Sequence, residues 1–205
     1  MVYRTFLFDN LPKWEDVPIS KINSFHWEHE NPFRPESYAQ ICGVRGKGIF
    51  ARLWSYEENP RCCYTKQDEP IYEDSCLELF LQPVFERQEY INFEMNCNGV
   101  YLSQFGKQRE KRVFLKDFCS VEPSISCFGI VENGNSAWGV EIYISESLIS
   151  KIYDFDFVLS PCEIKGNFYK CGDNTPKPHY AAFFPVDSPE LGFHNPACFG
   201  KIILN

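Results

Sequence analysis

Short apolar segments rich in β-branched and aromatic residues recur along the 205-residue chain, and scattered prolines separate them. Eight segments have the composition of β-strands, namely residues 49–54, 75–81, 90–97, 125–131, 138–144, 155–159, 179–184 and 199–204. The 14 prolines gather into no linker, and the chain shows no internal repeat or low-complexity tract. We therefore expect one domain over residues 1–205, an all-β sandwich of two antiparallel sheets.

One stretch has helical character instead. Ser145 can cap the first turn of a helix over Glu146–Tyr153. A small apolar face on that helix is formed by Leu148, Ile149 and Ile152. We expect a short connecting helix that covers one end of the core.

Composition limits the partners of the chain. The hydrophobic content of 44% and aromatic content of 17% suffice for one sizeable core. A net charge of −8 repels a phosphate backbone, so we expect no nucleic-acid partner. No apolar run approaches the roughly 18 residues that span a bilayer, so we expect no membrane partner either. Asp9 falls where the apolar part of a secretory signal would continue, which predicts a cytoplasmic protein, or an exported one if a leader has been removed.

The ten cysteines are dispersed, and those in the expected strands alternate with apolar residues. This pattern predicts buried, reduced thiols instead of a disulfide framework. Because the sequence has no CxxC pair, it assigns no zinc site.

Strand alternation gathers polar side chains on one sheet face. In residues 90–97 one face carries Tyr90, Asn92, Glu94 and Asn96, while the other carries Ile91, Phe93, Met95 and Cys97. In residues 75–81 the same rule places Glu78 opposite a row of leucines. We expect Glu78 and Glu94 to project from one face, and periodicity alone leaves open whether that face is solvated or binds a ligand.

Carboxylates and amides beside aromatic rings suit sugars, because pyranose C–H surfaces stack on rings while hydroxyl groups form hydrogen bonds. The aromatic candidates are Trp54, Tyr72, Trp138, Phe184 and Phe193. Trp54 and Trp138 lie inside apolar strands and are expected in the core. Tyr72 and Phe193 lie in turn-rich flanks, where binding residues concentrate.

Several motifs resemble the family 9 carbohydrate-binding modules, which are β-sandwiches related to the DOMON-like group. The motifs are PIYEDSCLELF at 70–80, YINFEMN at 90–96 with Gly99, WGVE at 138–141, FHNP at 193–196 and FGKIIL at 199–204. NFYKCGD at 167–173 and PHY at 178–180 resemble a divergent branch instead of the xylanase-attached members.

The resemblance implies non-catalytic binding of a small sugar or glycan end, linked to the breakdown of carbohydrates such as xylan. It places that sugar between Tyr72, with Ile71 as the alternative, and Phe193, where sugar-binding members carry tryptophan. Glu78 and Asn96 match positions that bond sugar hydroxyls, and Glu94 stands where an arginine is expected. A separately encoded glycoside hydrolase would be the partner.

The resemblance implies no cofactor beyond a structural calcium ion, for which no set of oxygen ligands is identifiable in the sequence. Two other functions compete with sugar binding. A β-sandwich glycoside hydrolase would use Glu78 and Glu94 as its carboxylate pair. Haem binding, as in some DOMON domains, would need an axial ligand such as Met95, which alternation directs into the core.

Overall fold

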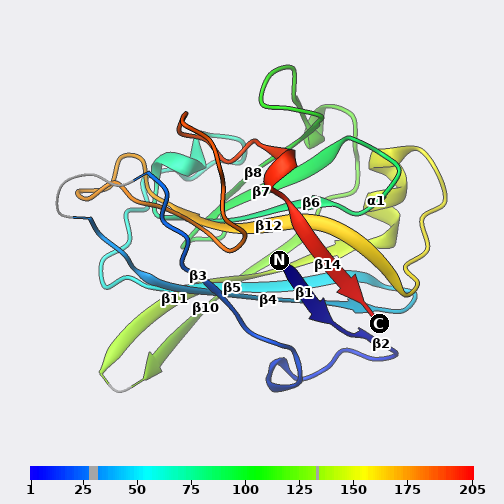
Figure 1. The fold of residues 1–205 in the computed structure, drawn as a ribbon, viewed down its shortest axis with the longest axis horizontal. Coiled ribbons are helices and arrows are strands. Elements are labelled where there is room, and N and C mark those ends of the chain that lie inside the picture. Colours follow the sequence, from blue (N-terminus) through cyan, green and yellow to red (C-terminus); the bar gives the residue numbers. More distant parts are fainter. Residues whose placement is uncertain (28–31, 133) are drawn as a thin grey trace.

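Two β-sheets stacked face to face make up the protein, as Figure 1 shows for this computed structural model, which describes residues 1–27, 32–132 and 134–205. The eight-stranded sheet runs β1 (Val2–Thr5), β14 (Gly200–Leu204), β12 (Cys162–Cys171), β6 (Cys76–Gln82), β7 (Tyr90–Asn96), β8 (Tyr101–Gly106) and β9 (Val113–Phe114), with β13 (Tyr180–Ala182) also pairing with β12. The six-stranded sheet runs β10 (Ser124–Glu132), β11 (Asn135–Ser145), β5 (Gly48–Tyr56), β4 (Glu36–Val44) and β2 (Leu7–Phe8), with β3 (Ser20–Ile22) also pairing with β4. The expected all-β sandwich is confirmed.

Most neighbouring strands pair antiparallel, as expected. Two pairs differ, because β1 runs parallel to β14 and β2 runs parallel to β4. Both parallel strands come from the first eight residues, for which the sequence analysis assigned no strand.

The main core lies between the sheets. From β6 and β7 it receives Leu77, Leu79, Leu81, Ile91, Phe93 and Met95, all nearly inaccessible to solvent. Full burial of each such side chain contributes about 1.5–3 kcal/mol. The expected alternation is thus confirmed, and the position of Met95 in this core does not favour the haem alternative.

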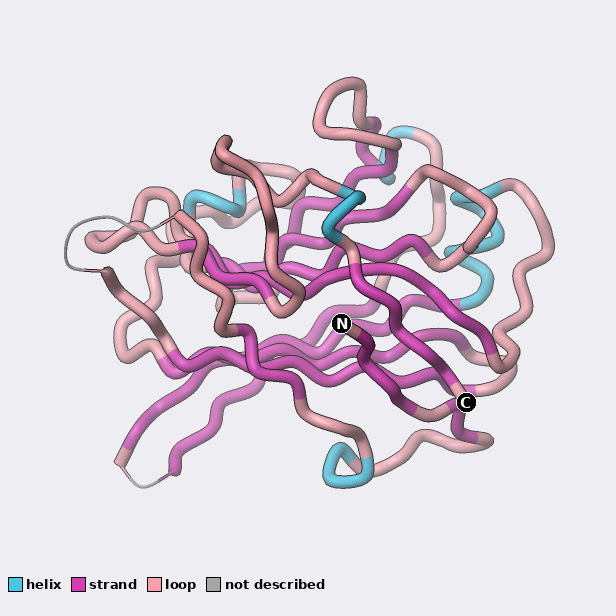
Figure 2. The backbone as a smooth tube through the Cα atoms, viewed as in Figure 1, coloured by secondary structure: helices cyan, strands magenta, loops and turns pink. Residues whose placement is uncertain are grey.

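A second apolar cluster packs on the opposite face of the eight-stranded sheet. Cys76 and Phe80 of β6, Tyr90 of β7 and Tyr169 of β12 belong to it. Long loops cover this face, on the side away from the six-stranded sheet (Figure 2). The polar face of β6 and β7 is therefore buried beneath loops.

Helix α1 (Glu146–Tyr153) covers one end of the sandwich, as expected. The Ser145 side chain accepts a hydrogen bond from the Leu148 backbone N–H at 3.1 Å and caps the helix. The apolar face of α1 is buried in the main core. In the described residues the connections hold four short 3₁₀ helices, η1 (Trp14–Asp16), η2 (Ile71–Glu73), η3 (Leu115–Asp117) and η4 (Pro196–Cys198).

The prediction of a strand over residues 155–159 is wrong. Two backbone N–H groups there bond to side chains of α1: Phe157 N donates to Ser150 Oγ and Leu159 N to Glu146 Oε1, both at 2.9 Å. Those donors are therefore not free to pair with a strand.

None of the described helices is long and apolar enough to cross a membrane.

Candidate functional site

A cavity of about 470 Å³ opens on the loop-covered face of the eight-stranded sheet. Strands β6 and β7 supply its floor through Glu78, Phe80 and Glu94. Loops supply its walls, including Tyr72 of η2 and residues 191–194 before η4. The volume falls within the roughly 300–1,000 Å³ typical of small-molecule sites.

Glu78 and Glu94 lie side by side on the floor, because they are directly paired in the β6–β7 register. Both side chains are almost completely buried. Burial, followed by the neighbouring Cys171 and Glu94, raises the pKa of Glu78 well above its usual range. Burial also raises the pKa of Glu94 to about 7, although Asn92 and Arg112 act in the opposite direction. The floor therefore holds a carboxylic acid beside a carboxyl group that titrates near neutrality.

Glu94 has one oxygen engaged and one without a partner. Its Oε1 accepts a hydrogen bond from Asn92 Nδ2 at 2.9 Å, whereas its buried Oε2 has no hydrogen-bond partner. The His194 Nε2 atom lies 3.8 Å from Oε1, but burial and two nearby arginines lower the pKa of His194 to about 3. That contact therefore involves a neutral imidazole and is not an ion pair. An unsatisfied buried carboxylate oxygen is costly, so it favours a ligand that can bond to it.

Arg112 supports Glu94 through Asn92. Its guanidinium group donates to Asn92 Oδ1 from Nε at 3.1 Å and from Nη2 at 2.6 Å, and it lies 4.1 Å from the Tyr90 ring centroid. The Asn92 amide then donates to Glu94. The family resemblance led us to expect an arginine at position 94, where this chain has Glu94. The loop after β8 supplies positive charge nearby through Arg109 and Arg112.

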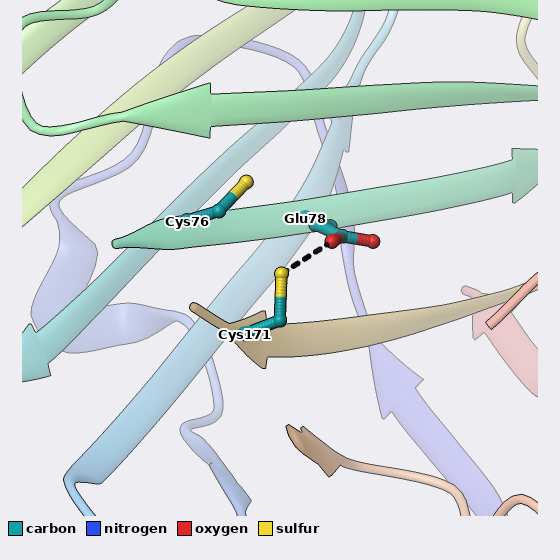
Figure 3. Close-up of side chains that lie close together, drawn as sticks. All are labelled: Cys76, Glu78 and Cys171. Atoms are coloured by element: carbon teal, nitrogen blue, oxygen red, sulfur yellow. Dashed lines mark hydrogen bonds between the residues drawn. The ribbon is translucent and has the colours of Figure 1, made fainter. Parts of the chain in front are cut away.

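Two thiols lie near Glu78, and one of them bonds to it. Cys171 Sγ, on the neighbouring strand β12, donates to Glu78 Oε1 at 2.9 Å, as Figure 3 shows. Cys76 lies two residues before Glu78 on β6 and is paired directly with Cys171. Alternation along β6 puts Cys76 and Glu78 on one face of the sheet. Because β12 was absent from the expected strands, the sequence could not bring Cys171 to them.

Tyr72 and Phe193 both line the cavity but differ in burial. The Tyr72 side chain is 40% exposed, whereas Phe193 is 8% exposed. The Phe193 ring stacks on Tyr169 with centroids 4.1 Å apart and planes 13° apart. Ile71, the alternative to Tyr72, is fully buried and does not line the cavity. Tyr72 thus presents a free ring, and Phe193 belongs partly to the second apolar cluster.

Asn96 does not line the cavity. Its Nδ2 atom donates to the Tyr64 carbonyl at 3.0 Å and to Asp74 Oδ2 at 3.1 Å. Its Oδ1 atom accepts from the backbone N–H groups of Asn98 and Val100, both at 3.1 Å. These bonds hold the turn after β7 and occupy the side-chain amide of Asn96. The structure therefore separates Asn96 from the other four residues expected to bind the sugar, which are Tyr72, Glu78, Glu94 and Phe193.

Several further residues of the cavity were not singled out from the sequence, among them Arg109, Asp173, Tyr180 and His194. Asp173 follows β12, and burial and nearby Glu73 raise its pKa to about 6. Arg109 approaches the loop at Gly192, where an added Cβ would lie 3.0 Å from its Nη1. Only prediction of β12 and of the β8–β9 loop geometry would have brought Asp173 and Arg109 to this site.

A model of carbohydrate-binding family 9 matches residues 7–204. The chain belongs to this family. The expected resemblance is thus confirmed over nearly the whole length. A search of curated proteins finds no significant match.

Solved structures share the fold of this family 9 chain. A protein described as carbohydrate-binding from Bacteroides uniformis aligns with a TM-score of 0.79 and 22% identity, covering 100% of this chain and 98% of that one. A family 9 module from Caldicellulosiruptor kristjanssonii in complex with glucose aligns with a TM-score of 0.63 and 10% identity, covering 98% and 95%. Its complex with cellotriose gives 0.61 and 10%, covering 98% and 93%.

One cluster of potential side-chain metal ligands in the described part of this family 9 chain does not suit calcium. Among the described residues, the one group of three such ligands is Cys76, Glu78 and Cys171. Calcium takes six to eight oxygen ligands, and two of these three ligands are sulfur.

Proposed function

We propose that this family 9 chain binds a mono- or oligosaccharide in the cavity without transforming it. The observation that carries the proposal is the exposed Tyr72 ring beside a floor on which the buried Glu94 Oε2 has no partner. A pyranose offers both complements, because its C–H face stacks on a ring and its hydroxyl groups bond to carboxyl oxygens. The glucose and cellotriose complexes of the Caldicellulosiruptor module support a glycan end or small sugar as ligand.

Raised pKa values also suit recognition of hydroxyl groups. A protonated Glu78 carries an O–H donor as well as acceptor oxygens, and ionised Glu94 is an acceptor only. A sugar hydroxyl both donates and accepts, so it can bond to either form. The two floor residues therefore offer donors and acceptors to one ring.

Calorimetric titration with glucose, cellotriose and xylose oligomers tests the proposal. Binding should weaken in Glu94→Gln, because the amide removes a negatively charged acceptor from the floor. Glu86→Gln is the matched control, since Glu86 is exposed in the turn between β6 and β7 and does not line the cavity. Equal affinity of both variants and the unmodified protein would count against the proposed site.

A glycoside hydrolase is the competing function, because such enzymes use a pair of carboxyl groups and Glu78 and Glu94 lie side by side. Such an enzyme separates the roles of its two carboxyl groups, one protonated and one ionised. Here burial raises the pKa of Glu78 well above its usual range and that of Glu94 to about 7, so the protonation of this pair does not by itself separate binding from hydrolysis. Release of reducing sugar from xylan, cellulose oligomers or mannan by the unmodified protein, lost in Glu78→Gln, would establish hydrolysis instead.

The proposal extends to a separately encoded glycoside hydrolase as partner. A module that binds without transforming contributes by holding its ligand near an enzyme, which raises the local concentration of substrate. Co-purification of a hydrolase with the tagged chain, dependent on added glycan, is the expected result.

A further inference from the structure

Two thiols and a carboxyl group converge at the base of the cavity. The ligand atoms of Cys76, Glu78 and Cys171 all lie within 4.8 Å of one another. Figure 3 shows the three side chains on β6 and β12, with the Cys171 sulfur directed at Glu78. Two of them, Glu78 and Cys171, line the cavity, while Cys76 lies behind. One side of the cluster is therefore open to an incoming ligand.

The frame that holds these three residues is rigid. Strand β6 lies between β7 and β12 in the middle of the sheet, and Cys76 is paired directly with Cys171. All three side chains are at most 2% exposed. Side chains fixed in this way lose little conformational freedom when they bind a common ligand.

Charge around the cluster favours a cation. Glu94 and Asp173 line the same cavity, and the Glu94 Oε2 atom has no hydrogen-bond partner. The cationic side chain that lines the cavity is Arg109, which bonds outward to the Leu191 carbonyl at 3.2 Å. Lys170, although next to Cys171, directs its Nζ atom to Glu57 at 3.2 Å. A positive ion at the cluster would compensate both carboxyl groups of the floor.

Sulfur selects the kind of cation. Thiolates bind zinc, cadmium and other soft ions, whereas magnesium and calcium prefer oxygen. Burial raises the pKa of Cys76 to about 12 and raises the pKa of Cys171 well above its usual range, so both are thiols until an ion displaces their protons. Three protein ligands and one open position form a common arrangement for zinc.

We propose that Cys76, Glu78 and Cys171 form a binding site for a thiophilic divalent ion such as Zn²⁺, with its fourth coordination position facing the cavity. The ion displaces the two thiol protons and the Glu78 carboxyl proton to solvent, and it takes two thiolates and the Glu78 carboxylate as ligands. The proposal does not depend on sugar binding. If both hold, ion and sugar compete for Glu78 or meet at the open position.

Titration of the reduced, sugar-free protein with Cd²⁺, followed by the ultraviolet thiolate-to-cadmium absorption band, tests the site. The band should saturate at one ion per chain. Cys171→Ser should abolish the high-affinity phase, and Glu78→Gln should weaken Cd²⁺ by at least the roughly 10–100-fold that loss of an outer-shell partner costs. The absence of sugar means that failure here leaves the proposed function standing.

A second group of neighbouring thiols provides the control. Cys62 and Cys127 lie close enough to Cys97 to raise its pKa, and Cys127 is exposed. Cys127→Ser should leave the band unchanged. A band lost in Cys127→Ser but kept in Cys171→Ser, or no band in the unmodified protein, would overturn the proposal. Circular dichroism checks that each variant folds, and if Cys171→Ser does not, unchanged Cd²⁺ affinity in Glu78→Gln would overturn it as well.

Discussion

Glu78 and Glu94 are paired directly across β6 and β7, and both are buried on the face of the sheet that carries the cavity. Two carboxyl groups so placed cannot both ionise without a cost in free energy. The protein tolerates them because loops, a thiol and an amide surround them: Cys171 donates to Glu78 and Asn92 donates to Glu94. Their protonation links stability to pH.

Glu94→Gln should change the pH dependence of stability. The folded protein raises the pKa of Glu94 from 4.5 to about 7, so between these values it binds more protons than the unfolded chain. The stabilisation is full below the unfolded pKa and is lost as pH rises through 7, a loss of about 3 kcal/mol. Relative to the unmodified protein, Glu94→Gln should therefore gain stability by that amount from pH 4.5 to 8.

Urea unfolding at a series of pH values measures this difference. His179 and His194, whose pKa values are lowered to about 4 and about 3, produce the opposite trend. Both histidines are present in both proteins, so their effect cancels apart from the change that Glu94→Gln makes at His194, whose Nε2 lies 3.8 Å from Glu94 Oε1. A difference that stays constant across the range would show that Glu94 titrates normally.

Lys170 and Glu57 form a buried ion pair between the sheets. Lys170 Nζ on β12 lies 3.2 Å from Glu57 Oε2, directly after β5, and donates to the Cys171 carbonyl at 2.9 Å. Lys170→Met should cost about 3–5 kcal/mol, because it leaves a buried carboxylate without its counter-charge. Adding Glu57→Gln should recover part of that loss, as chemical denaturation of the double variant would reveal. Strict additivity of the two changes would exclude the coupling.

Seven of the eight expected strands are present, and most of them have apolar residues that alternate with a period of two and meet the core from one side, whereas β10 is largely exposed. Residues 90–97 are the clearest case, since Ile91 and Phe93 enter the main core while Tyr90 joins the second cluster. The polar side chains of this strand also alternate with the apolar ones, so Glu94 lies on the face opposite Ile91 and Phe93. What periodicity could not supply is the loop cover that buries Asn92 and Glu94.

Strand β12 was missed because its residues do not look like a strand. Lys165, Gly166, Asn167 and Lys170 interrupt its apolar pattern, and tertiary contacts compensate the two buried polar side chains, Asn167 and Lys170. Asn167, for example, donates to the Phe184 carbonyl at 2.8 Å and accepts from Phe184 N at 2.9 Å. The same omission hid Cys171 and Asp173 from the site.

All ten cysteines are free in the structure. Thiol titration under denaturing conditions, on protein purified in the reduced state, should therefore count ten thiols. Under native conditions the exposed Cys63 and Cys127 should react first, because burial shields Cys42, Cys76 and Cys171. Time-resolved modification with mass spectrometry identifies the order. A count near zero after oxidant-free purification would mean that the chain forms disulfides.

Tyr72→Ala should weaken sugar binding with little effect on folding. The ring is 40% exposed, so its removal leaves no cavity in the core. Stacking contributes about 0.5–1.5 kcal/mol beyond area burial, which corresponds to as much as a tenfold loss of affinity. Phe85→Ala is the control, because Phe85 is also exposed but does not line the cavity. Unchanged affinity in Tyr72→Ala would remove this ring from the site.

Phe193→Ala should lower both affinity and stability. The ring lines the cavity, yet it also stacks on Tyr169 at 4.1 Å and contacts Trp27 with ring centroids 5.8 Å apart. Truncating a buried phenylalanine costs about 3–5 kcal/mol, so the melting temperature should fall steeply where that of Tyr72→Ala does not. Phe193→Leu separates the two roles, because it keeps most of the buried volume and removes the flat ring. Sugar affinity that falls in Phe193→Leu while the melting temperature largely recovers would assign the ring to binding, whereas full recovery of both would leave Phe193 only a structural role.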